Sequence, residues 1–325
     1  MTTLAEYISE YISDNISESI ISSTHTGKTG IDEELKKHGL NPDKATLNAD
    51  GSVDYDGDVR LMNHNLTRLP FKFNRVTGYF DISLNPLTSL DGSPRYVGDN
   101  FLCARCNRLT SLEGSPDVIA GGYKCVGCDL TSLKGMTQDI GDYVWVSDNK
   151  LRSLAGCPNV VKGAMYVDGN QLTTLKGGPE RVESSMFVNY TAITSLEGAP
   201  KYIATVLDCS ENSKLVSLKG AEDIQNDNLA IKCSGCSVLK SLEGCPREIF
   251  SLNAANCGLT TLYGSPDVVK HFFDVSNNQL TSLMWAPVLL SKAQNFKCSG
   301  NKVKFSRREV ERVITAGPHR FDDIK

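Results

Sequence analysis

Four cysteines in the first half of the chain have a spacing that suits a metal site. The stretch "FLCARCNRLTSL" holds Cys103 and Cys106, and "YKCVGCDLTSL" holds Cys125 and Cys128, which gives the pattern C-x2-C-x18-C-x2-C. Two C-x2-C pairs at about this separation are typical of structural zinc sites, in which four thiolates surround the ion. A zinc site formed by these four residues is therefore the first chemistry to consider.

A longer internal repeat offers a second explanation of the same spacing. A motif close to L-T-x-L recurs twelve times along the chain, with 20 to 24 residues between successive copies. Copies such as "FDVSNNQLTSL" and "MYVDGNQLTTL" follow a pattern close to F-x-C-S-x-N-x-L-T-S-L-x-G-x-P. A regular period of this length indicates a solenoid, in which each copy stacks on the next.

The repeat resembles the leucine-rich repeat, whose pattern L-x-L-x-x-N/C-x-L places a short parallel strand before a slot for Asn or Cys. Ten of the twelve copies have Asn or Cys in that slot. The chain turns away from the strand there, so an Asn amide or a small thiol can satisfy buried backbone groups. The residues of this predicted N/C ladder are Asn85, Cys106, Cys128, Asn149, Asn170, Asn212, Cys236, Cys257, Asn278 and Asn301.

The repeat also assigns each thiol of the candidate metal site to a structural slot. Cys103 and Cys125 occupy an inward strand position, and Cys106 and Cys128 occupy the N/C slot three residues later. The gap of 18 residues then follows from the length of the repeat. We therefore favour buried structural thiols and no cofactor, with zinc binding by these four residues as the alternative.

The resemblance implies an α/β-class leucine-rich-repeat solenoid. We expect a curved parallel β-sheet on the concave side, loops and polyproline-like segments on the convex side, and small helical caps at both ends. Residues 1–57 form the predicted N-terminal helical and hairpin cap, residues 58–305 the solenoid, and residues 306–325 a C-terminal capping helix and tail.

The N-terminal cap includes a predicted helix over residues 3–21 with an acidic row. This helix has two interpretations: it covers the end of the solenoid, or it is an arm that binds another copy or a partner.

Composition points away from several classes of protein. The net charge is −4, without the concentrated basic surface of a nucleic-acid-binding protein. No stretch approaches the ~20 apolar residues that a membrane span needs, and the start "MTTLAEYISE" lacks the features of a secretion signal. Eleven cysteines without such a signal favour reduced thiols. We predict a cytoplasmic protein that binds neither nucleic acid nor membrane.

A narrower resemblance concerns origin. The stretches "IISSTHTGKTG" and "LPFKFNRVTGYFDIS" and the repeated "LTSLEG-x-P" are similar to leucine-rich-repeat proteins encoded by large tailed bacteriophages. This resemblance implies a location in the host cytoplasm and brings no catalytic residues. The five histidines are scattered, and neither an H-E-x-x-H nor a G-x-S-x-G motif occurs. An enzyme is therefore not predicted.

The outward strand positions give the candidate binding site. The position between the two inward residues of successive copies contains three consecutive aromatics, flanked by Lys124 and Asp208. Aromatics on an exposed face beside charges are typical of a protein-binding hot spot. A register shifted by one residue would instead bury them, and a further possibility is that they only pack on one another. The predicted binding residues are Tyr143, Trp145, Tyr166, Phe187, Tyr190, Lys124 and Asp208.

Three functional hypotheses follow. The first is a non-enzymatic protein–protein interaction module that binds a host or phage protein through the concave face. The second is a virion or assembly component that oligomerises through its N-terminal arm, and the third is a carbohydrate-binding protein. The identity of the partner and the oligomeric state stay open.

Overall fold

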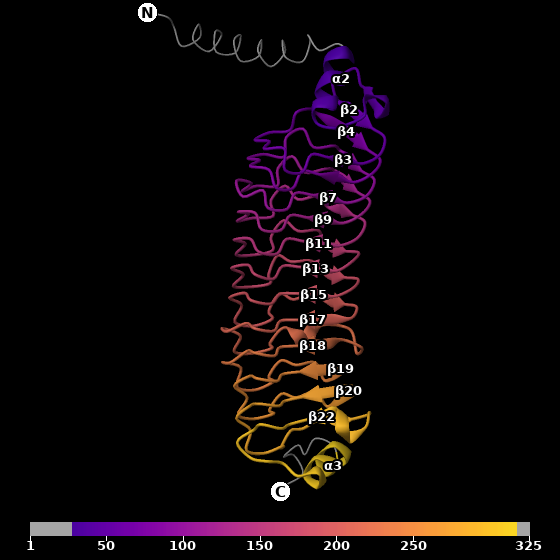
Figure 1. The fold of residues 1–325 in the computed structure, drawn as a ribbon. Coiled ribbons are helices and arrows are strands. Elements are labelled where there is room, and N and C mark those ends of the chain that lie inside the picture. The colour runs from indigo at the N-terminus through magenta and orange to yellow at the C-terminus, as the bar shows by residue number, and fades with distance from the viewer. Residues whose placement is uncertain (1–27, 317–325) are drawn as a thin grey trace, which may run out of the picture.

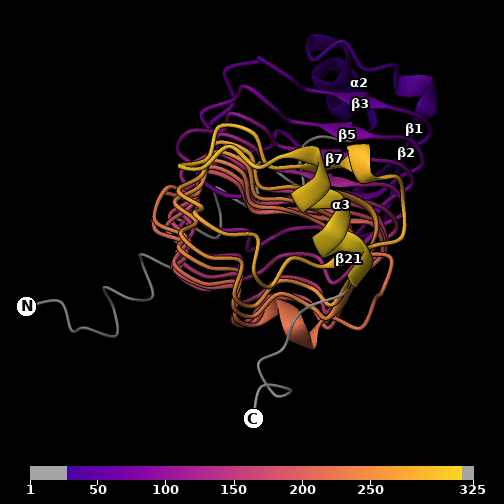
Figure 2. The same cartoon turned by 90° about the horizontal axis from the view of Figure 1, so that it is seen from below.

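A computed structural model of the protein describes residues 28–316. The predicted helix over residues 3–21 and the end of the predicted C-terminal tail lie outside the described residues. Figure 1 shows the repeats stacked into an elongated column, and the view from below in Figure 2 shows successive turns lying over one another.

A 13-stranded sheet runs along one side of the column. Every pair of neighbouring strands in it is parallel, and equivalent residues of successive copies lie opposite one another. The leucine-rich-repeat solenoid is thus confirmed, and the outer side of this sheet is called the sheet face below. Its strands are β3 (Val59–Arg60), β5 (Phe80–Asp81), β7 (Phe101–Leu102), β9 (Tyr123–Lys124), β11 (Val144–Trp145), β13 (Met165–Tyr166), β15 (Met186–Phe187), β17 (Val206–Asp208), β18 (Ala230–Lys232), β19 (Glu248–Asn253), β20 (Val268–Asp274), β21 (Val288–Leu289) and β22 (Phe296–Lys297).

The other side of the column contains more strand than the sequence predicted. Gly and Pro in the segment L-x-G-x-P-x-x-V predict only loops and polyproline-like structure. The β-branched residues after the Pro also pair in parallel, because stacking brings equivalent residues to strand spacing. They form two smaller sheets. The first contains an antiparallel β1–β2 hairpin and consists of β1 (Ala45–Leu47), β2 (Val53–Tyr55), β4 (Phe73–Val76), β6 (Tyr96–Val97), β8 (Val118–Ile119) and β10 (Asp139–Ile140). The second consists of β12 (Val160–Val161), β14 (Arg181–Val182) and β16 (Tyr202–Ile203).

One continuous hydrophobic core runs between the two sides. Strand residues that alternate with the exposed ones are fully buried, as Val144 and Val146 show on either side of Trp145. Alternation of this kind fixes the register, because a shift by one residue would expose the core set.

The predicted N/C ladder hydrogen-bonds neighbouring copies to each other. Asn170 donates from Nδ2 to the carbonyls of Val146 (3.0 Å) and Val167 (2.9 Å), and its Oδ1 accepts from the N–H of Leu151 (3.0 Å). In copies with Cys, the thiol donates to the equivalent carbonyl of the preceding copy; Cys257 Sγ lies 3.0 Å from the oxygen of Cys233. A thiol therefore replaces part of the amide's hydrogen bonding.

The residue immediately before the N/C slot adopts a left-handed conformation in all twelve copies of the repeat. Glycine occupies it in some copies, such as Gly127 (φ 64°) and Gly169 (φ 65°), but Asp148 (φ 55°) and Tyr190 (φ 52°) occupy it in others. This turn moves the chain off the sheet, and the row of such residues borders the sheet face. It is called the turn row below.

Small helices cover both ends of the described solenoid. At the start, α2 (Lys28–Lys37) and a 3₁₀ turn (Pro42–Lys44) precede the hairpin; further 3₁₀ turns span Ala221–Asp223 and Ala293–Asn295. At the end, α3 (Arg307–Ala316) buries Val310 and Ile314. Ser306 and Glu309 form a capping box, in which each side chain bonds the other's backbone N–H. No helix within residues 28–316 has the length and apolar character to cross a membrane.

Candidate functional site on the sheet face

The four cysteines of the C-x2-C pairs act as part of the core. Cys106 Sγ donates to the carbonyl of Ile82 (3.4 Å) and Cys128 Sγ to that of Cys103 (3.2 Å). Burial raises the pKa of Cys103 from 9.0 to about 11 and also raises that of Cys125, so both thiols stay protonated at neutral pH. Among the described residues, no group of three or more His, Cys, Asp or Glu is placed to hold a metal. The hydrogen bonds of Cys106 and Cys128 to the preceding copy favour the structural interpretation.

The predicted aromatic residues of neighbouring strands lie on top of one another on the sheet face. Trp145 pairs with Tyr166, and Tyr166 with Phe187, in the parallel register. The first two ring centroids are 5.1 Å apart and the second two 4.8 Å. All three side chains are partly exposed, so the alternative register that would bury them does not occur. These three residues are called the aromatic stack.

Neighbouring side chains cover several of the ring faces in the stack. Tyr166 lies between the other two rings, and Lys124 Nζ lies 4.2 Å from the centroid of Trp145 as a cation–π contact. The aromatics therefore do pack on one another, as the alternative interpretation has it, but they also stay partly exposed.

Asp208, the charged residue predicted at the other end, is more buried than a free surface carboxylate. Asp208 is only 9% exposed. Its Oδ1 accepts a hydrogen bond from the N–H of Ser210 (3.2 Å), and its Oδ2 lies 3.9 Å from Lys232 Nζ. Asp81 and Asp274, in the same position of other copies, accept the same bond from the residue two places on. Asp208 therefore stabilises the turn that follows its strand.

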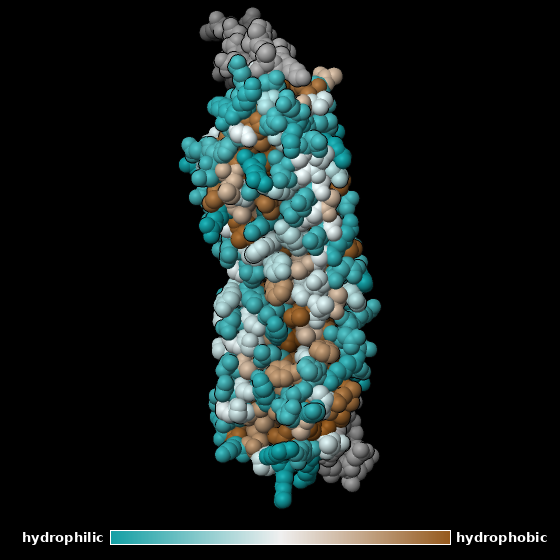
Figure 3. Space-filling model, turned by 45° about the vertical axis from the view of Figure 1, so that its right-hand side comes forward, coloured by the Kyte–Doolittle hydropathy of each residue, from teal (hydrophilic) through white to brown (hydrophobic). Residues whose placement is uncertain are grey.

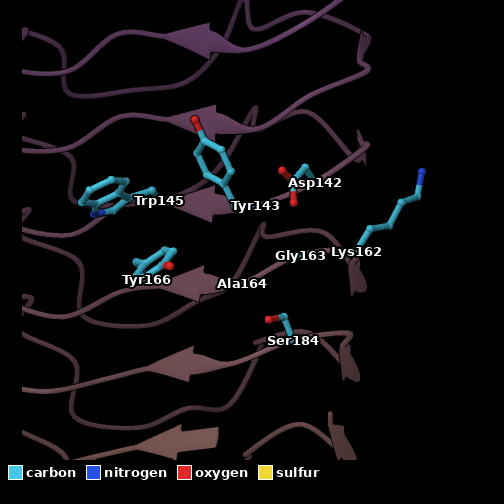
Figure 4. Close-up of a pocket in the computed structure, with 8 residues that line it drawn as sticks. All are labelled: Asp142, Tyr143, Trp145, Lys162, Gly163, Ala164, Tyr166 and Ser184. Carbon is cyan, nitrogen blue, oxygen red and sulfur yellow. The ribbon is translucent and has the colours of Figure 1, made fainter. Parts of the chain in front are cut away.

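Tyr143 borders a pocket beside the stack. The pocket has a volume of about 580 Å³ and is lined by Asp142, Tyr143, Trp145, Lys162, Gly163, Ala164, Tyr166 and Ser184. Figure 4 shows the Tyr143 ring leaning toward β9, away from Ala164. The ring covers Gly122, where an added Cβ would overlap it. The small Gly122 thus accommodates the ring, and the small Ala164 leaves the pocket open.

Tyr190 lies apart from the stack. It occupies the turn row, 66% of its surface is exposed, and no ring contact joins it to another aromatic of the described chain. A bulky side chain in the left-handed region costs about 1 kcal/mol or more, which the surrounding fold must offset. The structure therefore places six of the seven predicted binding residues along the strands and Tyr190 at the border.

Sequence reasoning missed the polar residues around the stack. Asp142 lines the pocket, Asp148 lies on the turn row, and Asp168 and Asn189 follow Tyr166 and Phe187 by two residues. The run "DYVWVSD", with an Asp at each end of an aromatic strand, was the available signal. The side of the molecule seen in Figure 3 likewise shows small apolar areas between hydrophilic residues.

Comparison of the sequence with protein-family models and with curated proteins finds no match. Among solved structures, YopM from Yersinia enterocolitica WA-314 is similar, with 18% sequence identity and a TM-score of 0.37. The similarity covers 76% of this chain and 61% of that chain, so less than two thirds of YopM is spanned. The leucine-rich-repeat architecture described above stands on the repeat geometry and does not depend on this likeness.

Proposed function

We propose that the protein is a non-enzymatic protein–protein interaction module whose binding surface is the sheet face around the aromatic stack. The observation that carries the proposal is the stack itself: three rings in register on three neighbouring strands, partly exposed, on a rigid solenoid. Large, preorganised aromatic surface with a polar border is what protein hot spots consist of. Binding such a surface requires little ordering of the solenoid.

The geometry favours a protein partner over a sugar. Carbohydrates bind aromatic residues by lying flat on a ring face. Here Tyr166 is enclosed by rings on both sides, and Lys124 lies over Trp145. A protein partner can contact the ring edges and fill the pocket beside Tyr143 with a side chain.

The remaining parts of the hypothesis rest on the sequence alone. A host or phage target and a location in the host cytoplasm follow from the resemblance to phage-encoded proteins and stay predictions. Oligomerisation through the N-terminal arm, the assembly hypothesis, concerns residues outside the described part of the chain. No observation on the described residues favours it over the sheet face.

The test is affinity capture from a bacterial lysate with three versions of the protein. Wild type is compared with Trp145→Glu/Tyr166→Glu, and with Val216→Glu/Leu290→Glu as a matched control that adds the same charge at exposed apolar residues away from the stack. Circular dichroism checks that all three fold. A protein captured by wild type and control but not by the stack variant supports the proposal. Equal capture by all three versions contradicts it.

A further inference from the structure

Carboxylates without a cationic partner surround the aromatic stack. The ion pairs of residues 28–316 include no partner for Asp142, Asp148, Asp168 or Glu211, whereas carboxylates on the other side of the column, such as Asp139, Glu180 and Glu183, have one. Asp148 and Glu211 lie on the turn row on either side of Tyr190 along the stack. The stack is therefore bordered by negative charge that the described chain does not neutralise.

A hydrogen-bond acceptor without a donor lies in the same area. Asn189 Oδ1 is buried and makes no hydrogen bond within the described chain. Asn189 lies opposite Asp168 in the strand register, since Gly169 N–H bonds the carbonyl of Asn189, and the carboxylate of Asp168 accepts from Ser147 Oγ (2.8 Å). Buried polar atoms are rarely left unpaired. The partly exposed carboxylate of Asp168 therefore offers oxygen atoms to a donor from outside, next to a buried acceptor that the described chain leaves unpaired.

The pocket beside Tyr143 has the same character. Asp142 lies beside Tyr143, whereas Lys162 points away from the rings toward Asp139, as Figure 4 shows for Lys162. Burial raises the pKa of Tyr143, with a smaller contribution from the negative charges of Asp142 and Asp99. Aromatic rings combined with a carboxylate form a favourable site for a Lys or Arg side chain.

Cations at the edges of this surface are already engaged or lie at one end. Lys124 lies over Trp145, Lys232 pairs with Asp208, and Arg105 is on the turn row two copies before Asp148. Resting on the proposed function, we propose that the partner is a protein that presents a basic segment, with a Lys or Arg side chain in the pocket beside Tyr143. Nucleic acid does not fit, because its phosphates would face the unpaired carboxylates.

The first experiment uses two defined probes: a fluorescent peptide of alternating arginine and glycine, and its glutamate counterpart. Binding is measured by anisotropy at low salt and at about 0.15 M salt. We expect the arginine peptide to bind wild type, more weakly at the higher salt, and to lose roughly tenfold in affinity with Asp142→Asn/Asp148→Asn/Asp168→Asn. Asparagine tolerates the left-handed conformation at position 148, so this variant is expected to fold.

A charge-matched control separates the site from the general acidity of the chain. The variant Asp91→Asn/Asp223→Asn/Glu243→Gln removes three exposed carboxylates from the segments that follow the L-T-x-L motif. It should bind the arginine peptide as wild type does. Equal loss in both triple variants, or preferential binding of the glutamate peptide, overturns the inference.

The same triple variants distinguish failure of the inference from failure of the proposed function. A captured protein that needs the aromatic stack, and binds the site variant more weakly, supports both. A captured protein that needs the stack but binds Asp142→Asn/Asp148→Asn/Asp168→Asn more tightly than wild type is consistent with the proposed function and contradicts the inference of a basic partner. One that is captured independently of the stack overturns both.

Discussion

The rings of Tyr166 and Phe187 lie on neighbouring strands with centroids 4.8 Å apart and planes that differ by 1°. Adjacent β-strands are separated by about the same distance, ~4.8 Å. The stacking is therefore a direct product of the repeat, which places equivalent residues of successive copies opposite each other. An aromatic residue in three successive copies produces a continuous column of rings without any special loop.

Stacking in this column should be measurable as an energetic coupling. A double-mutant cycle of Tyr166→Ala and Phe187→Ala should give a coupling of about 0.5–1.5 kcal/mol in the free energy of unfolding. Either single substitution already removes the contact between the two rings, so the double variant should lose less stability than the sum of the two single variants. Urea unfolding followed by circular dichroism provides the values. A control cycle of Tyr166→Ala and Tyr263→Ala, whose rings do not touch, should be additive. The same coupling in both cycles would contradict a stacking contribution.

The N/C ladder predicts a specific order of stability. Asn170→Ala leaves the carbonyls of Val146 and Val167 and the N–H of Leu151 without their partner, and should cost about 2–4 kcal/mol in the free energy of unfolding. Asn170→Cys should cost clearly less, because Cys257 and Cys128 show that a thiol can donate to the equivalent carbonyl. Chemical denaturation of the two variants gives the order. Equal costs would mean that the slot selects only for size.

The buried thiols predict a loss of stability at high pH. Burial raises the pKa of Cys103 from 9.0 to about 11 in the folded state. Its stabilising contribution is therefore complete below pH 9.0 and is lost as the pH rises through about 11, when the unfolded chain releases the proton more readily. The loss approaches roughly 3 kcal/mol for this residue.

Cys103→Val isolates that contribution, because Val146 and Val167 occupy the same inward slot in other copies. The variant should unfold at nearly the same temperature as wild type at neutral pH, and at a higher temperature than wild type near pH 11. Thermal melts across the alkaline range provide the comparison. Parallel pH curves for the two proteins would show that the thiol is not the cause.

Gly122 should control the orientation of Tyr143. A methyl group at position 122 would overlap the Tyr143 ring, so Gly122→Ala should destabilise the fold by about 1–3 kcal/mol or displace the ring into the pocket. The double variant Gly122→Ala/Tyr143→Ala should recover most of that loss. If urea unfolding shows no recovery in the double variant, the methyl group at position 122 clashes with the backbone and not with the Tyr143 ring.

The sequence was sufficient to predict the repeat, the register and the core, because a period of two along each strand fixes which residues are buried. The exposed positions of Trp145, Tyr166 and Phe187 and the burial of Val144 and Val146 follow from that pattern alone. The caps were predictable for a different reason, since a capping box such as Ser306 with Glu309 is a local signal.

Other features depended on three-dimensional contacts that the repeat pattern does not contain. The pocket depends on three residues that occupy the same position in successive copies of the repeat: Gly122, Tyr143 and Ala164. Gly122 makes room for the Tyr143 ring, and the small Ala164 leaves the space on the other side open. The second set of parallel strands forms through stacking of segments that contain Gly and Pro, whose local preference is for turns. Which carboxylates lack a cationic partner depends on the ion pairs of the folded chain, and the spacing of charges in the sequence does not specify those pairs.

Site-specific photo-crosslinking at the border of the stack tests directly whether a partner binds there. A photoreactive phenylalanine analogue replaces Tyr190, which is 66% exposed, and in a control replaces Tyr263, which is 51% exposed and lies away from the stack. After irradiation in a bacterial lysate, we predict a covalent adduct with one protein at position 190, and its loss when Trp145→Glu is added. An adduct only at position 263, or one at position 190 that persists with Trp145→Glu, would contradict binding through the aromatic stack.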